Sequence, residues 1–216
     1  MKLKRTDCIL YAVTDRTWLG KQTLAEQVEA ALQGGVTMVQ MREKNLEENR
    51  AEQEALELKM LCRKYGVPFI INNNVEMAKR IDADGVHVGQ SDMEASQARI
   101  ILGPDKIIGV TARTVEQARA AQEAGADYLG SGAVFGSFTK LDSHKLELEE
   151  LDRICGSVTI PVVAIGGIQA GNIAELKGRK IAGAAVVSGI FAQNDIKKGT
   201  EELKKRVIEI LGIGDE

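Results

Sequence analysis

Short apolar runs alternate with amphipathic segments along the whole chain. The apolar runs cover about residues 8–13, 36–40, 68–71, 85–88, 106–110, 128–131, 162–165 and 184–187. Short runs that are apolar at nearly every position are typical of parallel strands buried on both faces. We therefore predict eight buried parallel strands.

The segments between these runs have the periodicity and the start signals of helices. Thr23 with Glu26, and Thr114 with Gln117, have the capping-box spacing that predicts a helix start after each threonine. The first of these helices is expected to end at Gly34. Further helices are predicted at about 47–64, 75–80, 93–102, 146–154, 172–176 and 200–211.

Strict alternation of strand and helix indicates an α/β protein with a parallel sheet. Eight such units in 216 residues, with no linker or change of composition, predict one (β/α)8 TIM-barrel domain over residues 1–216. The alternative is an open doubly wound sheet, which usually has a glycine-rich turn after its first strand. Here that turn is Thr14, Asp15 and Arg16, so the closed barrel is favoured.

The last two predicted strands both run into glycines, at Gly166 and Gly167 and at Gly189. Glycine at a strand end allows a ligand to approach the backbone closely. The loops after strands 7 and 8 of (β/α)8 barrels often form a phosphate site. Either loop alone is better explained by a tight turn, but the two together favour phosphate binding.

Composition and charge narrow the choice of partners. The net charge is −3, so there is no general basic field for nucleic acid, and no apolar run approaches the roughly 20 residues of a membrane span. Three widely spaced cysteines form no metal motif or disulfide framework, which favours a reducing cytoplasm. We expect small-molecule partners, no nucleic acid and no membrane, and the chain is a possible homo-oligomer.

Cationic and hydroxyl side chains follow the predicted strands and would meet at one mouth of the barrel. The cations are Arg42, Lys44 and Lys140. The hydroxyls are Ser137, Thr139 and Ser188. Together they suit an anion with more than one phosphate. Alternatively, Arg42 pairs with Glu43 on the surface and Lys44 lies in a charged loop.

Oxygen donors at the same mouth suggest a metal. Asp92, Asn72 and Asn73 could hold a Mg²⁺ ion that bridges a diphosphate. The alternative for Asp92 is a cap on the following helix. We interpret His87 as a hydrogen-bonded histidine of the barrel interior rather than a catalytic base. Without a recognisable nucleophile and base, the residues favour chemistry in which a diphosphate leaves and the enzyme stabilises its charge.

Several collinear stretches carry a resemblance to one family. They read Tyr-Ala-Val-Thr-Asp-Arg at 11–16, Val-Gln-Met-Arg-Glu-Lys at 39–44, Ile-Ile-Asn-Asn-Asn-Val at 70–75, Ala-Asp-Gly-Val-His-Val-Gly-Gln-Ser-Asp at 83–92, and Ile-Gly-Val-Thr-Ala-Arg-Thr at 108–114. The chain resembles the thiamine-phosphate synthase (thiamine-phosphate pyrophosphorylase) family over nearly its whole length. The resemblance implies a (β/α)8 barrel and a Mg²⁺-dependent transferase. That enzyme joins 4-amino-2-methyl-5-hydroxymethylpyrimidine diphosphate to hydroxyethylthiazole phosphate, or its carboxylate, and gives thiamine phosphate and diphosphate.

The resemblance also implies roles for individual residues. Gln40 would contact the pyrimidine, and Thr111, in place of a serine, would lie near it. Asp92 would bind the metal, with Asn73 in the position of a second ligand. The residues implied to bind the diphosphate are Arg42, Lys44, Asn72 and Lys140. The residues implied to hold the thiazole phosphate are Ser137, Thr139, Gly167, Val187 and Ser188.

Departures from the family pattern keep other functions open. Asn73 stands where the family has Asp, Arg113 where it often has His, and Gly136 where the sixth loop usually has Pro. An uncharged ligand weakens a Mg²⁺ site, so a non-catalytic binder of thiamine phosphate precursors is one alternative. A thiazole tautomerase of the same fold is another, although Arg42 and Lys44 would then have no diphosphate to bind. A phosphosugar aldolase or isomerase barrel is a more distant alternative.

Overall fold

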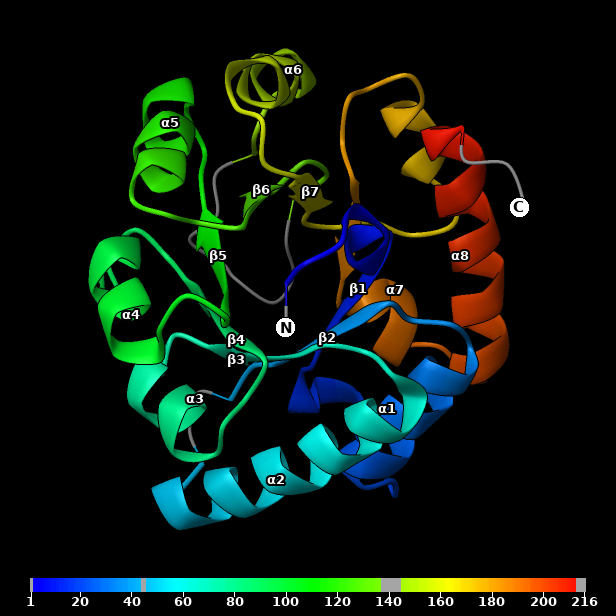
Figure 1. Cartoon of the computed structure of the whole chain (residues 1–216). Coiled ribbons are helices and arrows are strands. Elements are labelled where there is room, and N and C mark those ends of the chain that lie inside the picture. Colours follow the sequence, from blue (N-terminus) through cyan, green and yellow to red (C-terminus); the bar gives the residue numbers. More distant parts are fainter. Residues whose placement is uncertain (1, 44–45, 137–144, 213–216) are drawn as a thin grey trace.

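Eight parallel strands close into a barrel, as the alternation in the sequence predicted. The computed structural model describes residues 2–43, 46–136 and 145–212. Each strand pairs with its neighbours in sequence order, and β8 returns to pair with β1. Figure 1 looks along the barrel and shows the helices as a ring around the strands. The (β/α)8 prediction is confirmed and the open doubly wound sheet is excluded.

The observed strands agree with the predicted runs to within two residues at each end. They are β1 Leu10–Val13, β2 Met38–Met41, β3 Phe69–Asn72, β4 Gly85–Val88, β5 Ile107–Thr111, β6 Tyr128–Gly132, β7 Val162–Ile165 and β8 Gly183–Val186. At the first strand, Cys8 belongs instead to a short 3-10 helix, η1 (Arg5–Cys8). Apolar content therefore located the strands well, but it did not mark their ends.

The helices follow the strands, with local differences from the prediction. They are α1 Leu24–Gln33, α2 Glu48–Tyr65, α3 Val75–Arg80, α4 Ala95–Leu102, α5 Val115–Glu123, α6 Leu148–Ser157, α7 Ser188–Phe191 and α8 Ile196–Leu211. Two more 3-10 helices are η2 (Arg16–Trp18) and η3 (Ile173–Leu176), the second of which replaces the short helix expected at 172–176. The one-turn α7 was not predicted, and α8 begins four residues early because Asp195 caps it through the Lys198 amide.

The two predicted capping boxes have different outcomes. At α1 the box is complete: Thr23 Oγ1 accepts from the Glu26 amide at 3.1 Å, and Glu26 Oε2 accepts from the Thr23 amide at 2.7 Å. At α5, Thr114 Oγ1 accepts from the Gln117 amide at 3.2 Å. Gln117 Oε1, however, accepts from the Arg113 amide at 2.8 Å, so this half of the predicted box is wrong. Spacing alone does not distinguish the two arrangements.

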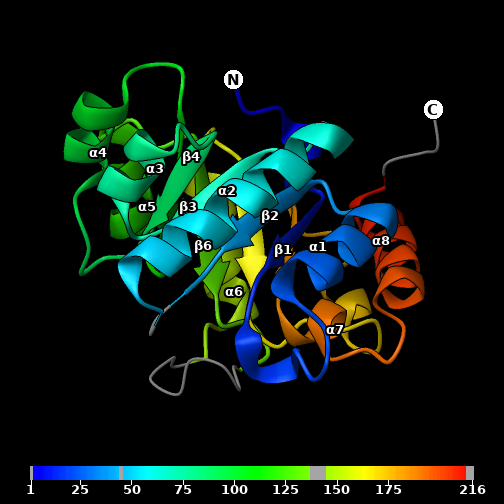
Figure 2. The ribbon, with the colours of Figure 1, turned by 90° about the horizontal axis from the view of Figure 1, so that it is seen from below.

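Alternate strand side chains form two separate apolar layers. One set points outward against the helices, and α1 and α2 lie in front of β1 and β2 in Figure 2. The other set fills the barrel interior with residues that include Tyr11, Met38, Ile70 and Tyr128. Leu3, before β1, packs against this inner cluster. Burial on both faces explains why the strands are apolar almost throughout.

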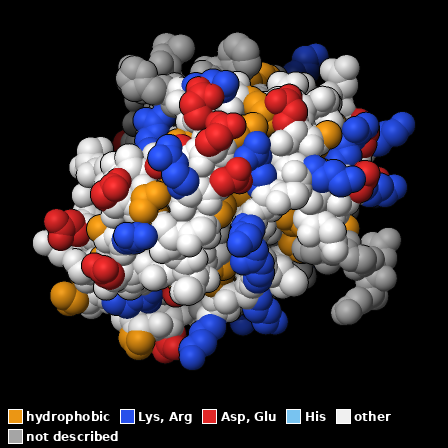
Figure 3. Space-filling view, turned by 90° about the horizontal axis from the view of Figure 1, so that it is seen from above, with side chains coloured by type: hydrophobic (Ala, Val, Ile, Leu, Met, Phe, Trp, Pro, Cys, Tyr) orange, Lys and Arg blue, Asp and Glu red, His pale blue; other side chains and the backbone are white. Residues whose placement is uncertain are grey.

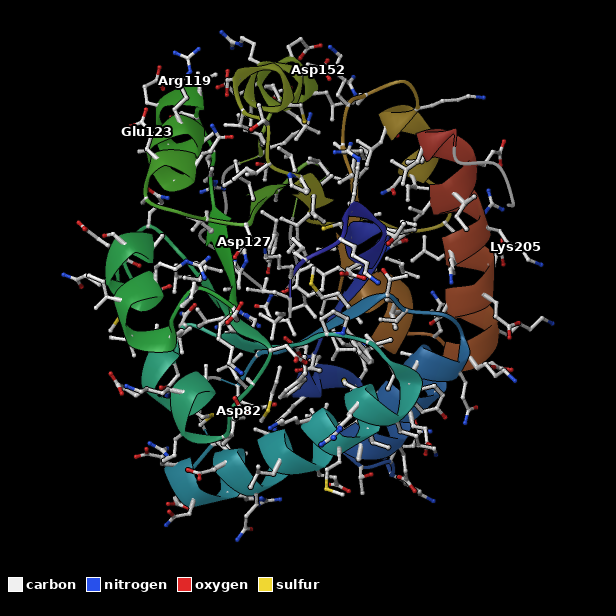
Figure 4. All side chains as sticks on the ribbon, viewed as in Figure 1. Asp82, Arg119, Glu123, Asp127, Asp152 and Lys205 are labelled. Atoms are coloured by element: carbon white, nitrogen blue, oxygen red, sulfur yellow. The ribbon has the colours of Figure 1, made fainter. Side chains whose placement is uncertain are left out.

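The outer helices carry many of the charged side chains. Figure 4 shows Arg119, Glu123, Asp152 and Lys205 on the helical ring, and all four residues are exposed. Figure 3 shows basic and acidic side chains interspersed on the face that it draws. In the described parts of the chain, no helix is long and apolar enough to cross a membrane.

Small residues on β5 and β6 make room for large side chains inside the barrel. A Cβ atom added to Gly109 would overlap the ring of Tyr128, which is wholly buried. A Cβ atom added to Gly130 would lie 3.1 Å from Cε1 of His87. Side chains of adjacent strands compete for the same interior volume, so these glycines set the position of the tyrosine and the histidine.

We expect Gly109→Ala to destabilise the fold because the added methyl group overpacks the barrel interior. The free energy of unfolding should fall by about 1–3 kcal/mol, measured by chemical denaturation. Gly156→Ala in α6 is the matched control, because a Cβ atom added there would meet no other atom within 4 Å. It should leave stability unchanged or raise it slightly. Equal stability of the Gly109→Ala variant and the wild type would contradict the proposed packing.

Candidate active site

A cavity of about 180 Å³ opens at the carboxyl ends of the strands. All eight strands, or the turns that follow them, contribute to its wall. In barrels of this kind the chemistry takes place at this end, because the eight βα loops meet there. The cavity is therefore the candidate active site.

Seven of the predicted site residues line this cavity. They are Gln40, Arg42, Asn72, Thr111, Gly167, Val187 and Ser188. They come from five different strands or strand ends, so closure of the barrel brings together residues far apart in the sequence. Four more predicted residues, Lys44, Ser137, Thr139 and Lys140, lie outside the described residues.

Arg42 is held at the mouth by the turn after β1. Its Nη1 lies 3.2 Å from Oδ2 of Asp15, and both side chains are about 15% exposed. Its backbone amide donates to Thr14 Oγ1 at 2.9 Å, and the Thr14 amide donates to the carbonyl of Gln40 at 2.9 Å. The turn after β1 thus fixes both the backbone and the guanidinium of Arg42.

Glu43 does not pair with Arg42, so the alternative of an Arg42–Glu43 ion pair on the surface is wrong. Its Oε2 accepts from Nε of Arg16 at 2.6 Å, and Arg16 also contacts Glu54. Burial raises the pKa of the Glu43 carboxyl, although the bond from Arg16 acts in the opposite direction. The Arg42–Asp15 and Arg16–Glu43 ion pairs each link the turn after β1 to the turn after β2. Of these four residues, only Arg42 lines the cavity.

Below the mouth, His87 uses both ring nitrogens within the barrel. Nδ1 lies 3.0 Å from the Tyr128 hydroxyl, and Nε2 lies 3.0 Å from Oγ1 of Thr111. The Tyr128 hydroxyl is also 2.8 Å from that of Tyr11, which accepts from Nε2 of Gln40 at 2.6 Å. This geometry agrees with the interpretation of His87 as an interior histidine.

The glycine loop after β7 lies close to the turn after β6. Gly166 and Gly167 have φ values of 104° and 67°, which favour glycine. A Cβ atom at Gly167 would lie 2.6 Å from the carbonyl oxygen of Phe135. The loop is fixed from its other side by Asn172, whose Nδ2 donates to the Gly167 carbonyl at 2.9 Å. Both glycines are therefore required by the backbone path along this wall of the cavity.

The two predicted metal ligands lie outside the cavity wall. Asn73 is exposed with φ of 63°, and its amide donates to the carbonyl of His87 at 2.8 Å. Asp92 Oδ2 accepts from the Gly89 amide at 2.7 Å. Asp92 does not cap α4, since Glu94 occupies the N-cap position. Among the described residues, no group of three His, Cys, Asp or Glu side chains could hold a metal.

The donor set nevertheless fits one kind of magnesium site. Asp92 would supply one carboxylate, and Asn72 at the end of β3 would supply an amide from the cavity wall. Mg²⁺ often takes one or two protein oxygens and completes its shell with water and substrate phosphates. A site with a single carboxylate is consistent with an ion that arrives with a diphosphate.

Some residues of the site gave no clear signal in the sequence. Tyr11 lines the cavity, and Tyr128 forms hydrogen bonds beneath it, but each looks like an ordinary strand aromatic. Arg113, which the sequence showed only as a departure from the family pattern, also lines the cavity, and its Nε donates to the Gly132 carbonyl at 2.9 Å. Asp15 occurs in the turn without glycine and in the family-like stretch 11–16, but neither gave it a role. Its partner Arg42 is brought to it by the pairing of β1 with β2.

The closed barrel and its polar mouth define a (β/α)8 protein with a small-molecule site at the carboxyl ends of its strands. The family model described as thiamine monophosphate synthase matches residues 10–190. A thiamine-phosphate synthase of Clostridium tetani is 45% identical over 94% of this chain and 97% of its own. One of Ruminiclostridium cellulolyticum is 48% identical over 92% of this chain and 95% of its own.

A solved structure agrees with these sequence relatives. Thiamine phosphate pyrophosphorylase of Pyrococcus furiosus superposes with a TM-score of 0.89 at 40% identity, over 96% of this chain and 99% of its own. The chain belongs to the thiamine-phosphate synthase family and is a transferase. The resemblance found in the sequence, and the function it implied at the level of the family, are confirmed.

We expect Arg42→Gln to weaken the binding of inorganic diphosphate about ten- to hundredfold, because a hydrogen bond to a charged group contributes about 1.5–3 kcal/mol. Isothermal titration calorimetry measures the change. The control is Arg206→Gln on α8, whose guanidinium pairs with Glu202 at 2.9 Å on the exposed surface. Equal affinities for the Arg42→Gln and Arg206→Gln variants would remove Arg42 from the anion site.

Proposed function

We propose that this chain forms thiamine phosphate from 4-amino-2-methyl-5-hydroxymethylpyrimidine diphosphate and hydroxyethylthiazole phosphate, or its carboxylate, and that it releases diphosphate with the help of Mg²⁺. The observation that carries the proposal is the composition of the cavity wall. It combines a fixed cation at Arg42, polar groups for a ring at Gln40 and Thr111, and the glycine loop after β7. Identity of about 45% to named synthases supports it.

With hydroxyethylthiazole phosphate, the proposed reaction breaks one bond and makes another; with its carboxylate, the bond between the ring and the carboxylate also breaks and carbon dioxide leaves. The bond between the pyrimidine methylene carbon and the diphosphate oxygen breaks, and the electron pair leaves with the diphosphate. The thiazole nitrogen then donates its lone pair to the methylene carbon. Arg42 stabilises the charge of the departing diphosphate, and Asp15 holds the guanidinium in place for it. These two steps need no protein base, which suits a cavity rich in charge and hydrogen-bond donors.

The roles of the other residues follow the family resemblance, and their position in the cavity wall supports them. In this proposal Gln40 and Thr111 face the pyrimidine, and Gly167, Val187 and Ser188 hold the thiazole phosphate; all five residues line the cavity. When bound, Mg²⁺ neutralises part of the diphosphate charge, with Asp92, Asn72 and Asn73 as the candidate oxygen donors. Lys44 and Lys140 would add cations, and Ser137 and Thr139 hydroxyls. A cytoplasmic location and a possible homo-oligomer stay predictions.

The two other functions differ in what they require of the site. A thiazole tautomerase needs a base, and both ring nitrogens of His87 are already hydrogen-bonded to Tyr128 and Thr111. A binder without turnover requires only the anion and ring contacts. The uncharged Asn73, exposed beside the mouth, is the observation that favours the binder over an efficient enzyme.

The direct test is an assay of thiamine phosphate formation by the purified chain. Both substrates are supplied with and without Mg²⁺, and the product is oxidised to a fluorescent thiochrome for detection. Mg²⁺-dependent product is the expected result. Calorimetric binding of both substrates without any product would overturn the transferase proposal and leave the binder.

We expect Asn73→Asp to lower the Mg²⁺ concentration needed for half-maximal activity severalfold, because the new carboxylate adds a charged oxygen ligand. A Mg²⁺ titration of the initial rate measures the shift. Asn74→Asp is the matched control, since it adds the same charge one residue further on. Asn74 caps α3 by accepting from the Met77 amide at 2.8 Å, a bond that an Asp keeps. An identical Mg²⁺ requirement in all three proteins would place residue 73 away from the metal.

A further inference from the structure

Five side chains form an unbroken chain of hydrogen bonds through the barrel. In order they are Gln40, Tyr11, Tyr128, His87 and Thr111, on β2, β1, β6, β4 and β5. The successive distances are 2.6, 2.8, 3.0 and 3.0 Å. Both ends of this chain, Gln40 and Thr111, line the cavity. The proposed reaction uses only those two ends, so the three residues between them have no role in it.

The direction of the hydrogen bonds follows from Gln40. Its Nε2 donates to the Tyr11 oxygen, so the Tyr11 proton is free for another acceptor. Among the described residues, Tyr128 is the acceptor that the Tyr11 hydroxyl reaches. The Tyr128 proton then goes to Nδ1 of His87, and a neutral His87 carries its own proton on Nε2 and donates it to Thr111.

The burial of the two tyrosines keeps this direction fixed. Burial raises the pKa of the Tyr11 and Tyr128 hydroxyls, which therefore stay protonated and each supply one proton to the chain. Their rings also pack edge to face, with centroids 5.8 Å apart, and Gly109 leaves room for the ring of Tyr128. Packing holds the rings, so removal of one hydroxyl interrupts the hydrogen bonds and leaves the ring contacts in place.

The direction determines what each end presents to a ligand. Gln40 uses its amide nitrogen on Tyr11, and its Oε1 receives no hydrogen bond from the described residues. Thr111 accepts from His87, and its own proton is available to the cavity. The site therefore presents an acceptor at Gln40 and a donor at Thr111.

We propose that Tyr11, Tyr128 and His87 are positioning residues that fix this polarity, so that the site selects a ring with a donor facing Gln40 and an acceptor facing Thr111. The ligand part of this proposal rests on the proposed function, in which the ring is a 4-aminopyrimidine. Its exocyclic amine donates and its ring nitrogens accept. In the 4-oxo analogue the exocyclic oxygen accepts and the neighbouring ring nitrogen donates, while the other ring nitrogen still accepts, so the polarity of the group that faces Gln40 is reversed.

The polarity is tested first without any ligand. The chain has two histidines, so a His144→Gln variant labelled with ¹⁵N-histidine reports on His87 alone. We expect one neutral tautomer with its proton on Nε2. Tyr128→Phe removes the donor to Nδ1 and should give a mixture of tautomers. A proton on Nδ1 in the protein with Tyr128, or a mixture there, would overturn the assigned direction. This readout stands even if the proposed function fails.

The second test measures selectivity between two ligands. The probes are the diphosphates of the 4-amino and the 4-oxo pyrimidine, bound by calorimetry so that no turnover is needed. We expect Tyr128→Phe to lower the ratio of their affinities about tenfold or more, because a broken chain no longer fixes the two ends. Tyr11→Phe should lower the ratio by a similar factor. The double variant should lower it no further, since either change alone interrupts the chain of hydrogen bonds.

Ser131→Ala is the matched control on the same strand as Tyr128. Its hydroxyl is buried and has no partner among the described residues, so its loss should leave the ratio unchanged. Weaker binding of both probes by Tyr128→Phe at an unchanged ratio would mean a purely structural role and would contradict the proposal. Turnover by the wild type reports separately on the proposed function, so a failure of that function can be distinguished from a failure of the proposed positioning role.

Discussion

Closure of the eight strands into one barrel is the constraint on which the rest of the structure depends. Closure turns every second side chain of each strand into a shared interior, where residues of neighbouring strands compete for volume. Tyr11, Tyr128 and His87 lie in it, and Gly109 leaves room for Tyr128 while Gly130 leaves room for His87. The polar groups that line the mouth are the next inward residues along the same strands, so one packing arrangement supports both the core and the site.

The described part of the site is positioned by strand ends and the short turns that follow them. Gln40 and Thr111 lie within strands, and Arg42 lies just past β2 and is fixed by Thr14 and Asp15 in the turn after β1. Side chains on rigid elements hold their geometry without a ligand, which lowers the ordering cost on binding. A cation and hydrogen-bonding groups placed in advance are what a departing diphosphate requires.

Patterns that depend on one segment were predictable from the sequence, and contacts between segments were not. Continuous apolar runs located every strand, and the Thr23 box located α1, because burial and capping are local. The box expected at Thr114 was half wrong, since Gln117 can reach either of two neighbouring amides. Asp15 and Tyr128 gained their partners only through barrel closure. Their importance depends on strand pairing, which a single sequence does not display.

The most direct test of the central claim is a crystal structure of the chain with thiamine phosphate, diphosphate and Mg²⁺. The claim is that one cavity holds both halves of the product in a fixed orientation. We expect the diphosphate at Arg42, the pyrimidine between Gln40 and Thr111, and the thiazole phosphate along the wall of Gly167 and Ser188. A pyrimidine outside the Gln40 and Thr111 pair, or a diphosphate on the glycine wall, would contradict the account.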